Sequence, residues 1–158
     1  MPEERFDVVD PVDVGDLSDV QENPILPATK RVKCVVKRVN ANSNKEKTWR
    51  WLNAGLQIKD GLDAQGKYKN MYVNTDNICY YADPTLYQDA VQDKRHLGKL
   101  KNLLKATGLL GRKVDDQLIQ DMKGKQVYAD IIQIQDDYVG ELVNRAVRLR
   151  EVPIEEQV

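Results

Sequence analysis

KEKTWRWLNAGLQIKDG, residues 45–61, decides the expected fold because it carries two patterns at once. Apolar residues occupy alternate positions from Leu52 to Ile58, as in a β-strand that buries one face. Both tryptophans of the chain, Trp49 and Trp51, have the opposite parity. They therefore point to the face that the sheet does not need for its core, and this placement requires an explanation.

Charge is divided unevenly along the 158 residues, although the net charge is only −1. Residues 1–24 hold eight acidic residues and one basic residue, whereas residues 30–59 hold nine Lys or Arg and one acid, Glu46. An acidic arm on a basic body predicts either a polyanionic partner or an arm that masks the body. The alternative is an arm that only solubilises a basic sheet.

The composition divides the chain into three parts. Residues 1–27 are proline-rich and acidic, which predicts a mostly disordered arm. Residues 28–151 form the expected folded domain, and residues 152–158 an acidic tail. Four apolar residues give the arm a docking strip: Phe6, Val8, Val9 and Val14.

Five strands and a helical insert are expected from the periodicity. The strands are expected at 31–41, 48–60, 67–76, 125–135 and 141–152, with a polar turn at 136–140 between the last two. A helix over 84–108 and a short one before Gly124 separate the third strand from the fourth. This order is that of the five-stranded OB-fold barrel, with an open α+β sheet as the alternative. Gly55 inside the long second strand predicts a bulge or a bend.

The second and third strands carry a candidate binding surface. Trp49, Trp51 and the amides of the second strand would share one face with the tyrosines and asparagines of residues 67–76. Rings, amides and flanking cations suit single-stranded nucleic acid, whose bases stack on aromatic side chains while Lys and Arg follow the phosphates. The expected nucleic-acid-binding residues are Trp49, Trp51, Arg50, Tyr68, Tyr72, Lys33, Lys37, Arg38, Lys45, Lys47, Lys67, Lys69 and Asn70.

Other uses of these residues remain open. A tryptophan could instead cover the mouth of the barrel or hold the arm, since large aromatic residues are usually well buried. The same face would also suit a protein interface. Arg148 and Arg150 either extend the basic surface or decorate a solvated strand.

The sequence favours a non-catalytic protein without metal or cofactor. His96 is the only histidine and lies in a basic segment without an acid–base partner. The pairs at 115–116 and 136–137 are typical of a helix cap and a turn. Cys34 and Cys79 are isolated, as expected for reduced thiols in a cytoplasmic protein. Neither a signal peptide nor an apolar run of membrane-spanning length is apparent.

Five segments in their order resemble a family of small bacteriophage proteins encoded near recombination and replication genes. They are PILPATKRVKCVVKRVNAN, LQIKDGLDAQGKYKNMYV, LGKLKNLLKATGL, MKGKQVYADI and NRAVRL, within residues 25–150. The family looks like single-stranded-DNA-binding proteins with an OB fold. The resemblance implies no particular base-contacting residue, and the acidic arm is longer than it would lead us to expect.

Together these patterns predict a sequence-tolerant single-stranded-DNA-binding protein of phage replication or recombination, with RNA left open as a ligand. Its acidic termini are candidate contacts for replication or recombination proteins, and a homo-oligomer is allowed. The alternative is a viral protein-interaction or connector module that uses the same aromatic face.

Overall fold

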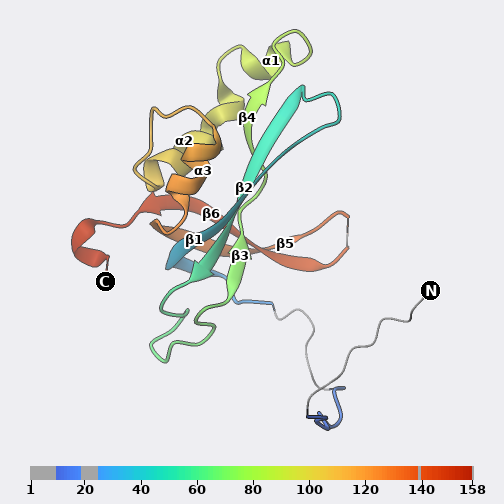
Figure 1. The fold of residues 1–158 in the computed structure, drawn as a ribbon, viewed down its shortest axis with the longest axis vertical. Coiled ribbons are helices and arrows are strands. Elements are labelled where there is room, and N and C mark those ends of the chain that lie inside the picture. The colour runs from blue at the N-terminus through green and yellow to red at the C-terminus, as the bar shows by residue number, and fades with distance from the viewer. Residues whose placement is uncertain (1–9, 19–24, 139, 158) are drawn as a thin grey trace.

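The computed structural model describes residues 10–18, 25–138 and 140–157. The protein is mainly β, with one six-stranded sheet in the order β3-β2-β1-β5-β6 and β4 also paired with β2 (Figure 1). The strands are β1 (Thr29–Ser43), β2 (Trp49–Ile58), β3 (Tyr72–Asn74), β4 (Ile78–Ala82), β5 (Gln126–Gln135) and β6 (Leu142–Glu151). The helices are α1 (Gln88–Val91), α2 (Gly98–Ala106), α3 (Asp116–Met122) and the 3-10 turns η1 (Arg95–Leu97) and η2 (Ile154–Glu156).

The pairing of β1 with β2 forms the centre of the sheet. As expected from the alternation, Leu52, Leu56 and Ile58 are completely buried. Each such side chain contributes about 1.5–3 kcal/mol through burial. The expected irregularity near Gly55 is present, but it lies in the partner strand, where Lys37 is an extra residue between the pairs Val36–Leu56 and Arg38–Gly55.

α2 and α3 lie together on one side of the sheet (Figure 1). α2 buries three leucines in the common core, and α3 adds Leu118 and Met122. Asp115 caps α3 by accepting a hydrogen bond from the Leu118 N–H at 2.9 Å. The single helix expected over 84–108 is wrong: it is divided into α1, η1 and α2, because Lys94 has φ +61° and cannot continue a right-handed helix.

The expected third strand is too long at its beginning. β3 starts at Tyr72, because Tyr68 and Asn70 have φ +66° and +67° and belong to the preceding loop. The Asn70 N–H donates to the Ile58 carbonyl at 2.8 Å, which holds this loop against the end of β2. A strand that the periodicity did not predict, β4, follows β3 and pairs with the first residues of β2.

β1 and β2 continue beyond the core, and β4 joins them there. We call this extension the wing; it comprises residues 41–43 of β1, 49–51 of β2, 79–82 of β4 and the turn 44–48. Asn44 closes the turn, since its Oδ1 accepts from the N–H groups of Thr48 (2.9 Å) and Trp49 (3.1 Å). The wing is therefore a three-stranded platform with an ordered tip.

The two termini meet the body differently. Residues 10–18 lie away from it, with Val14 66 % exposed, so Val14 does not dock there (Figure 1). The rest of the predicted docking strip, Phe6, Val8 and Val9, lies outside the described residues. Leu26 is buried, although the arm was expected to reach residue 27, because its N–H and carbonyl bond the Asn144 amide.

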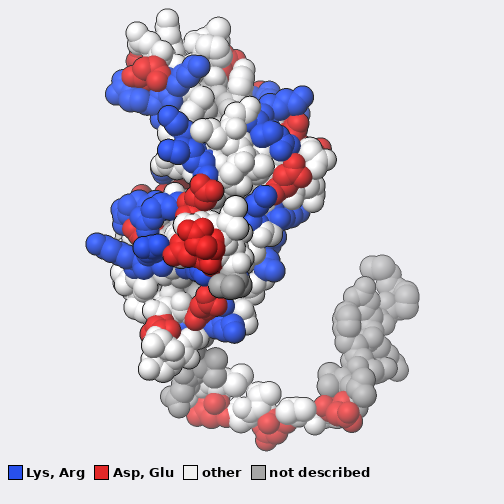
Figure 2. Space-filling model, turned by 90° about the vertical axis from the view of Figure 1, so that its left-hand side faces the viewer, with Lys and Arg blue, Asp and Glu red and all other residues white. Residues whose placement is uncertain are grey.

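The C-terminal segment also begins inside the body. Val152 is completely buried, and η2 follows it directly. In Figure 2 the described part of the N-terminal arm shows acidic but no basic side chains, whereas both signs of charge are interspersed on the body. Among the described residues, no helix has the length and apolar character that crossing a bilayer requires.

Both cysteines are buried free thiols, and each belongs to a different region. Cys34 lies in the middle of β1, and its burial raises the pKa of the thiol to about 12. Cys79 lies in the wing, and burial raises the pKa of its thiol as well.

Candidate nucleic-acid interface

The strand register defines one polar and aromatic surface opposite the core, which we call the outer face. On it Trp51 pairs with Asn42, Asn53 with Asn40, and Gln57 with Tyr72. Residues paired in an antiparallel sheet have side chains on the same face. The outer face comprises Arg38, Asn40 and Asn42 of β1, Trp49, Trp51, Asn53, Gly55 and Gln57 of β2, and Tyr72 and Asn74 of β3.

The two tryptophans differ in what surrounds them, although both are half-buried. The Trp49 ring packs edge-on against Tyr87, with 5.0 Å between ring centroids and 70° between planes. Trp49 is thus partly engaged in holding the segment that precedes α1. Trp51 has no aromatic partner among the described residues, so its ring is the better candidate for stacking on a base.

A second stacking element lies farther along the outer face. The Arg38 guanidinium lies over the Tyr72 ring, 4.9 Å from its centroid, and Tyr72 is 49 % exposed. Gly55 makes room for this pair, because a Cβ there would lie 3.2 Å from Arg38 Nε. The arrangement presents a ring and a cation together, as a base with its phosphate requires.

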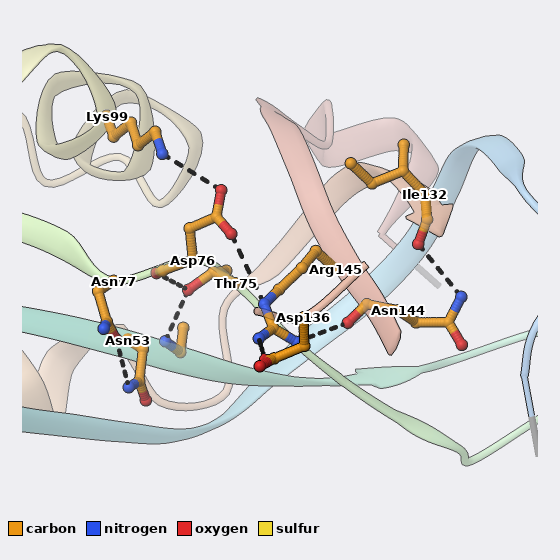
Figure 3. A network of polar contacts seen from close by, with 10 residues as sticks. Asn53, Thr75, Asp76, Asn77, Lys99, Ile132, Asp136, Asn144 and Arg145 are labelled. Atoms are coloured by element: carbon orange, nitrogen blue, oxygen red, sulfur yellow. Dashed lines mark hydrogen bonds and ion pairs between the residues drawn. The ribbon is translucent and has the colours of Figure 1, made fainter. Parts of the chain in front are cut away.

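A row of amides lies between the two stacking elements, and Figure 3 shows its contact between Asn53 and Asn77. Asn40 Nδ2 donates to Asn53 Oδ1 at 3.4 Å, and Asn53 Nδ2 donates to Asn77 Oδ1 at 3.2 Å. Asn53 and Asn77 line a groove of about 250 Å³ together with Asn74, Thr75, Asp76, Ile134 and Arg145. Amide groups both donate and accept, so this row can hydrogen-bond any base edge.

The acidic residues near the groove are paired with cations. Asp76 contacts Lys99 Nζ at 3.2 Å and Arg145 Nε at 3.6 Å, and Arg145 also contacts Asp136 at 3.4 Å (Figure 3). Thr75 beside them forms an isolated parallel bridge with Ala146 of β6. The network therefore joins the end of β3 to α2 and β6, and it offsets negative charge that would repel a phosphate.

The predicted lysines are distributed around the outer face. Lys67 lies 5.1 Å from the centroid of the Tyr68 ring, in the loop before β3. Lys33 is already engaged, because its Nζ donates to the Glu156 carbonyl at 2.5 Å, and Arg31 contacts Glu156 Oε1 at 3.4 Å. η2 thus occupies the cations at the core end of β1. The other predicted lysines are exposed, and they are Lys37, Lys45, Lys47 and Lys69.

Besides the lysines around it, three predicted site residues lie off the outer face. Arg50 points to the opposite side, because it pairs with Ser43 and Tyr81 and alternates with the tryptophans. Tyr68 packs partly against the core. Asn70 lies in the same loop, where its carbonyl, not its side chain, accepts from Gln57 Nε2 at 3.3 Å.

The residues that the prediction missed are three asparagines and one arginine. Asn40 and Asn42 alternate at the end of β1, and this period of two was a usable signal for the outer face. Asn77 and Arg145 come from segments whose approach depends on the three-dimensional fold, so no local pattern identified them.

Arg148 and Arg150 are anchored on one buried carboxylate, although their own side chains are 61 % and 47 % exposed. Both donate to the buried Asp130 carboxylate, Arg148 Nε at 2.6 Å and Arg150 Nη2 at 2.9 Å, and the Arg31 N–H donates to it at 2.9 Å. Burial alone raises the pKa of Asp130, but the hydrogen bonds from Arg148, the Arg31 N–H and Arg150 outweigh it and lower the pKa to about 2. The cluster is a charge network between β1, β5 and β6, with a buried carboxylate and two exposed arginines.

The groups considered for catalysis have structural partners. His96 Nδ1 lies 2.9 Å from the Ala90 carbonyl, and Asp115 caps α3. In the described part of the chain, no three His, Cys, Asp or Glu residues are grouped so that they could hold a metal ion.

Neither the models of known protein families nor the curated proteins gave a match to this sequence.

Proposed function

We propose that the protein is a non-catalytic, sequence-tolerant single-stranded-DNA-binding protein that uses the outer face, with the sheet forming an OB-type barrel. The observation that carries the proposal is the combination on one face of the Trp51 ring, the stacked Arg38–Tyr72 pair and the amide row between them. Bases would stack on the rings, the amides would bond their edges, and Lys37 and Lys69, the exposed lysines nearest in sequence to Arg38 and Tyr72, would follow the phosphates.

The topology supports the barrel in two ways. The helices lie between β4 and β5, where an OB fold has its helix, and the order β3-β2-β1-β5-β6 matches the OB order when β3 and β4 count as one interrupted strand. The bridge from Thr75 to Ala146 brings the two ends of that order together. Phage replication or recombination is the setting that the sequence resemblance implies.

Titration of tryptophan fluorescence with an oligo-dT strand tests this function. We expect quenching that weakens as salt rises, because stacking and counterion release act together. Trp51→Ala should lower the affinity by about 1–3 kcal/mol, which is roughly 5- to 150-fold. Trp49→Ala should have a smaller effect, since that ring already packs on Tyr87.

Leu110→Ala is the control, because Leu110 is 55 % exposed between α2 and α3, on the helical side of the sheet and not on the outer face. It should leave the affinity unchanged. The proposal fails if wild-type protein binds neither oligo-dT nor oligo-U at low salt, and a protein partner for the aromatic face would then be the better hypothesis.

A further inference from the structure

The side of the wing opposite the tryptophans carries its own aromatic and cationic groups. The Arg50 guanidinium lies over the Tyr81 ring, 4.6 Å from its centroid, and Arg50 Nε donates to the Lys47 carbonyl at 3.1 Å. Tyr81 is 37 % exposed. Arg50 and Tyr81 are thus held in place by the wing itself, while the tyrosine ring still reaches solvent.

An irregularity in β4 adds a second tyrosine to this side. Tyr80 is an extra residue between the pairs Arg50–Tyr81 and Trp51–Cys79. β-bulges of this kind redirect side chains. Tyr80 consequently lines the same hollow as Ser43 and Arg50. Tyr80 and Tyr81, which would point to opposite faces in a regular strand, therefore both lie on this side of the wing.

The hollow is a shallow, open depression of about 410 Å³ whose charge suits an anionic ligand. No acidic side chain lines it, and both charged members, Lys47 and Arg50, are cations. The lining residues are Ala41, Asn42, Ser43, Lys47, Arg50 and Tyr80.

The tip of the wing connects this hollow with the outer face. The turn 44–48 is fixed by the Asn44 side chain, whose Nδ2 also donates to Thr48 Oγ1 at 2.7 Å. Lys45 and Lys47 are both exposed on this short turn. A phosphate chain that leaves Trp51 therefore meets two lysines before it reaches Arg50.

We propose that the hollow binds one nucleotide of the same single strand that lies on the outer face, so that the strand passes over the tip of the wing. A phosphate would contact Lys47 and Arg50, and the base would stack on the accessible part of Tyr80, a half-buried residue that also packs against the core. This inference depends on the proposed function, because it extends the path of that ligand to a second face.

The length of the DNA strand distinguishes binding at the outer face from binding at the hollow. A strand of about 5 nucleotides fills the outer face alone, whereas one of about 16 also reaches the hollow. In the double variant Lys47→Ala/Arg50→Ala we expect the affinity for the long strand to fall about tenfold. The magnitude of its slope of log affinity against log salt should decrease by about 1.4, because each of two lost phosphate contacts to a single strand contributes about 0.7. Affinity for the short strand should change less than about twofold.

Lys105→Ala/Lys123→Ala is the matched control, since it removes two exposed cations outside the wing. It should leave the difference between the two lengths intact. Circular dichroism checks that each variant is folded. As an independent readout, a photoreactive thymine analogue at the end of the long strand should cross-link to Tyr80 or Tyr81.

The outcomes are distinct. An equal loss for both lengths would place Lys47 and Arg50 on the same site as the tryptophans and overturn the second contact. No loss at either length, with binding retained, would also overturn it while leaving the proposed function intact. If wild-type protein binds neither strand, both proposals fail.

Discussion

The two ends of the β1–β2 pairing use the same strands for different purposes. At the core end, Val36 and Leu56 face each other and both are completely buried. In the wing, Ser43 faces Arg50 and Asn42 faces Trp51, and all four side chains are at least partly accessible. Strands that continue past their core thus provide a platform with two usable sides, and residues there can serve recognition with little cost to the core.

The strongest test of this comparison is to shorten one side chain at each end of the β1–β2 pairing. Leu56→Ala should lower the free energy of unfolding by about 2–5 kcal/mol, because it leaves a cavity in the core. Trp51→Ala should lower it by less than half as much, since Trp51 is only half-buried. Urea denaturation followed by circular dichroism measures both. Equal losses would show that the wing is part of the cooperative core.

The core end also contains the only buried carboxylate among the described residues, Asp130. At neutral pH, Asp130→Asn should destabilise the protein by about 1–3 kcal/mol, as expected for lost hydrogen bonds to a charged group. The folded-state pKa of about 2 lies below the ordinary value of 3.8. The contribution is therefore complete above about pH 4 and is lost as the pH falls towards 2.

Denaturation of wild type and Asp130→Asn across that pH range measures this effect. The difference between them should shrink on acidification. Asp137→Asn, at an exposed turn, should stay within about 0.5 kcal/mol of wild type at every pH. A difference between wild type and Asp130→Asn that is constant with pH would mean that the carboxylate acts by its shape and not by its charge.

The smallest expected effect is on DNA affinity, and it concerns the two cations that η2 contacts at the core end of β1. Glu156→Gln removes the exposed ion pair with Arg31 but keeps the main-chain contact to Lys33. Such pairs contribute about 0.2–1 kcal/mol. We expect oligo-dT affinity to rise at most about fivefold at low salt and to be unchanged at high salt. An affinity that is unchanged at low salt would confine the DNA path to the wing and the amide row.

The parity of β2 could be predicted because one local period of two determines both its faces. Leu52, Leu56 and Ile58 are buried, and Trp49 and Trp51 share the opposite face, as the alternation indicated. The short helix α3 could also be predicted from local signals, since Asp115 and Gly124 mark its ends.

The remaining differences arise where the backbone departs from a regular period. Residues 67–74 alternate like a strand, but two left-handed residues, Tyr68 and Asn70, redirect the chain before β3 begins. Tyr80 reverses the parity of β4 through a bulge that becomes apparent only when β4 pairs with β2. Arg50 belonged to the predicted site by its place in the sequence, whereas strand pairing assigns it to the other side of the wing.

The two thiols can report separately on how often the wing and the core open. A thiol-directed reagent reacts only with an accessible thiolate, and both cysteines are buried with raised pKa values. Each must therefore wait for its own region to open. Cys79 would be labelled when β4 separates from the wing, and Cys34 only when the centre of the sheet opens. The ratio of their labelling rates, followed in a single chain, reports how independently the platform moves while the core stays closed.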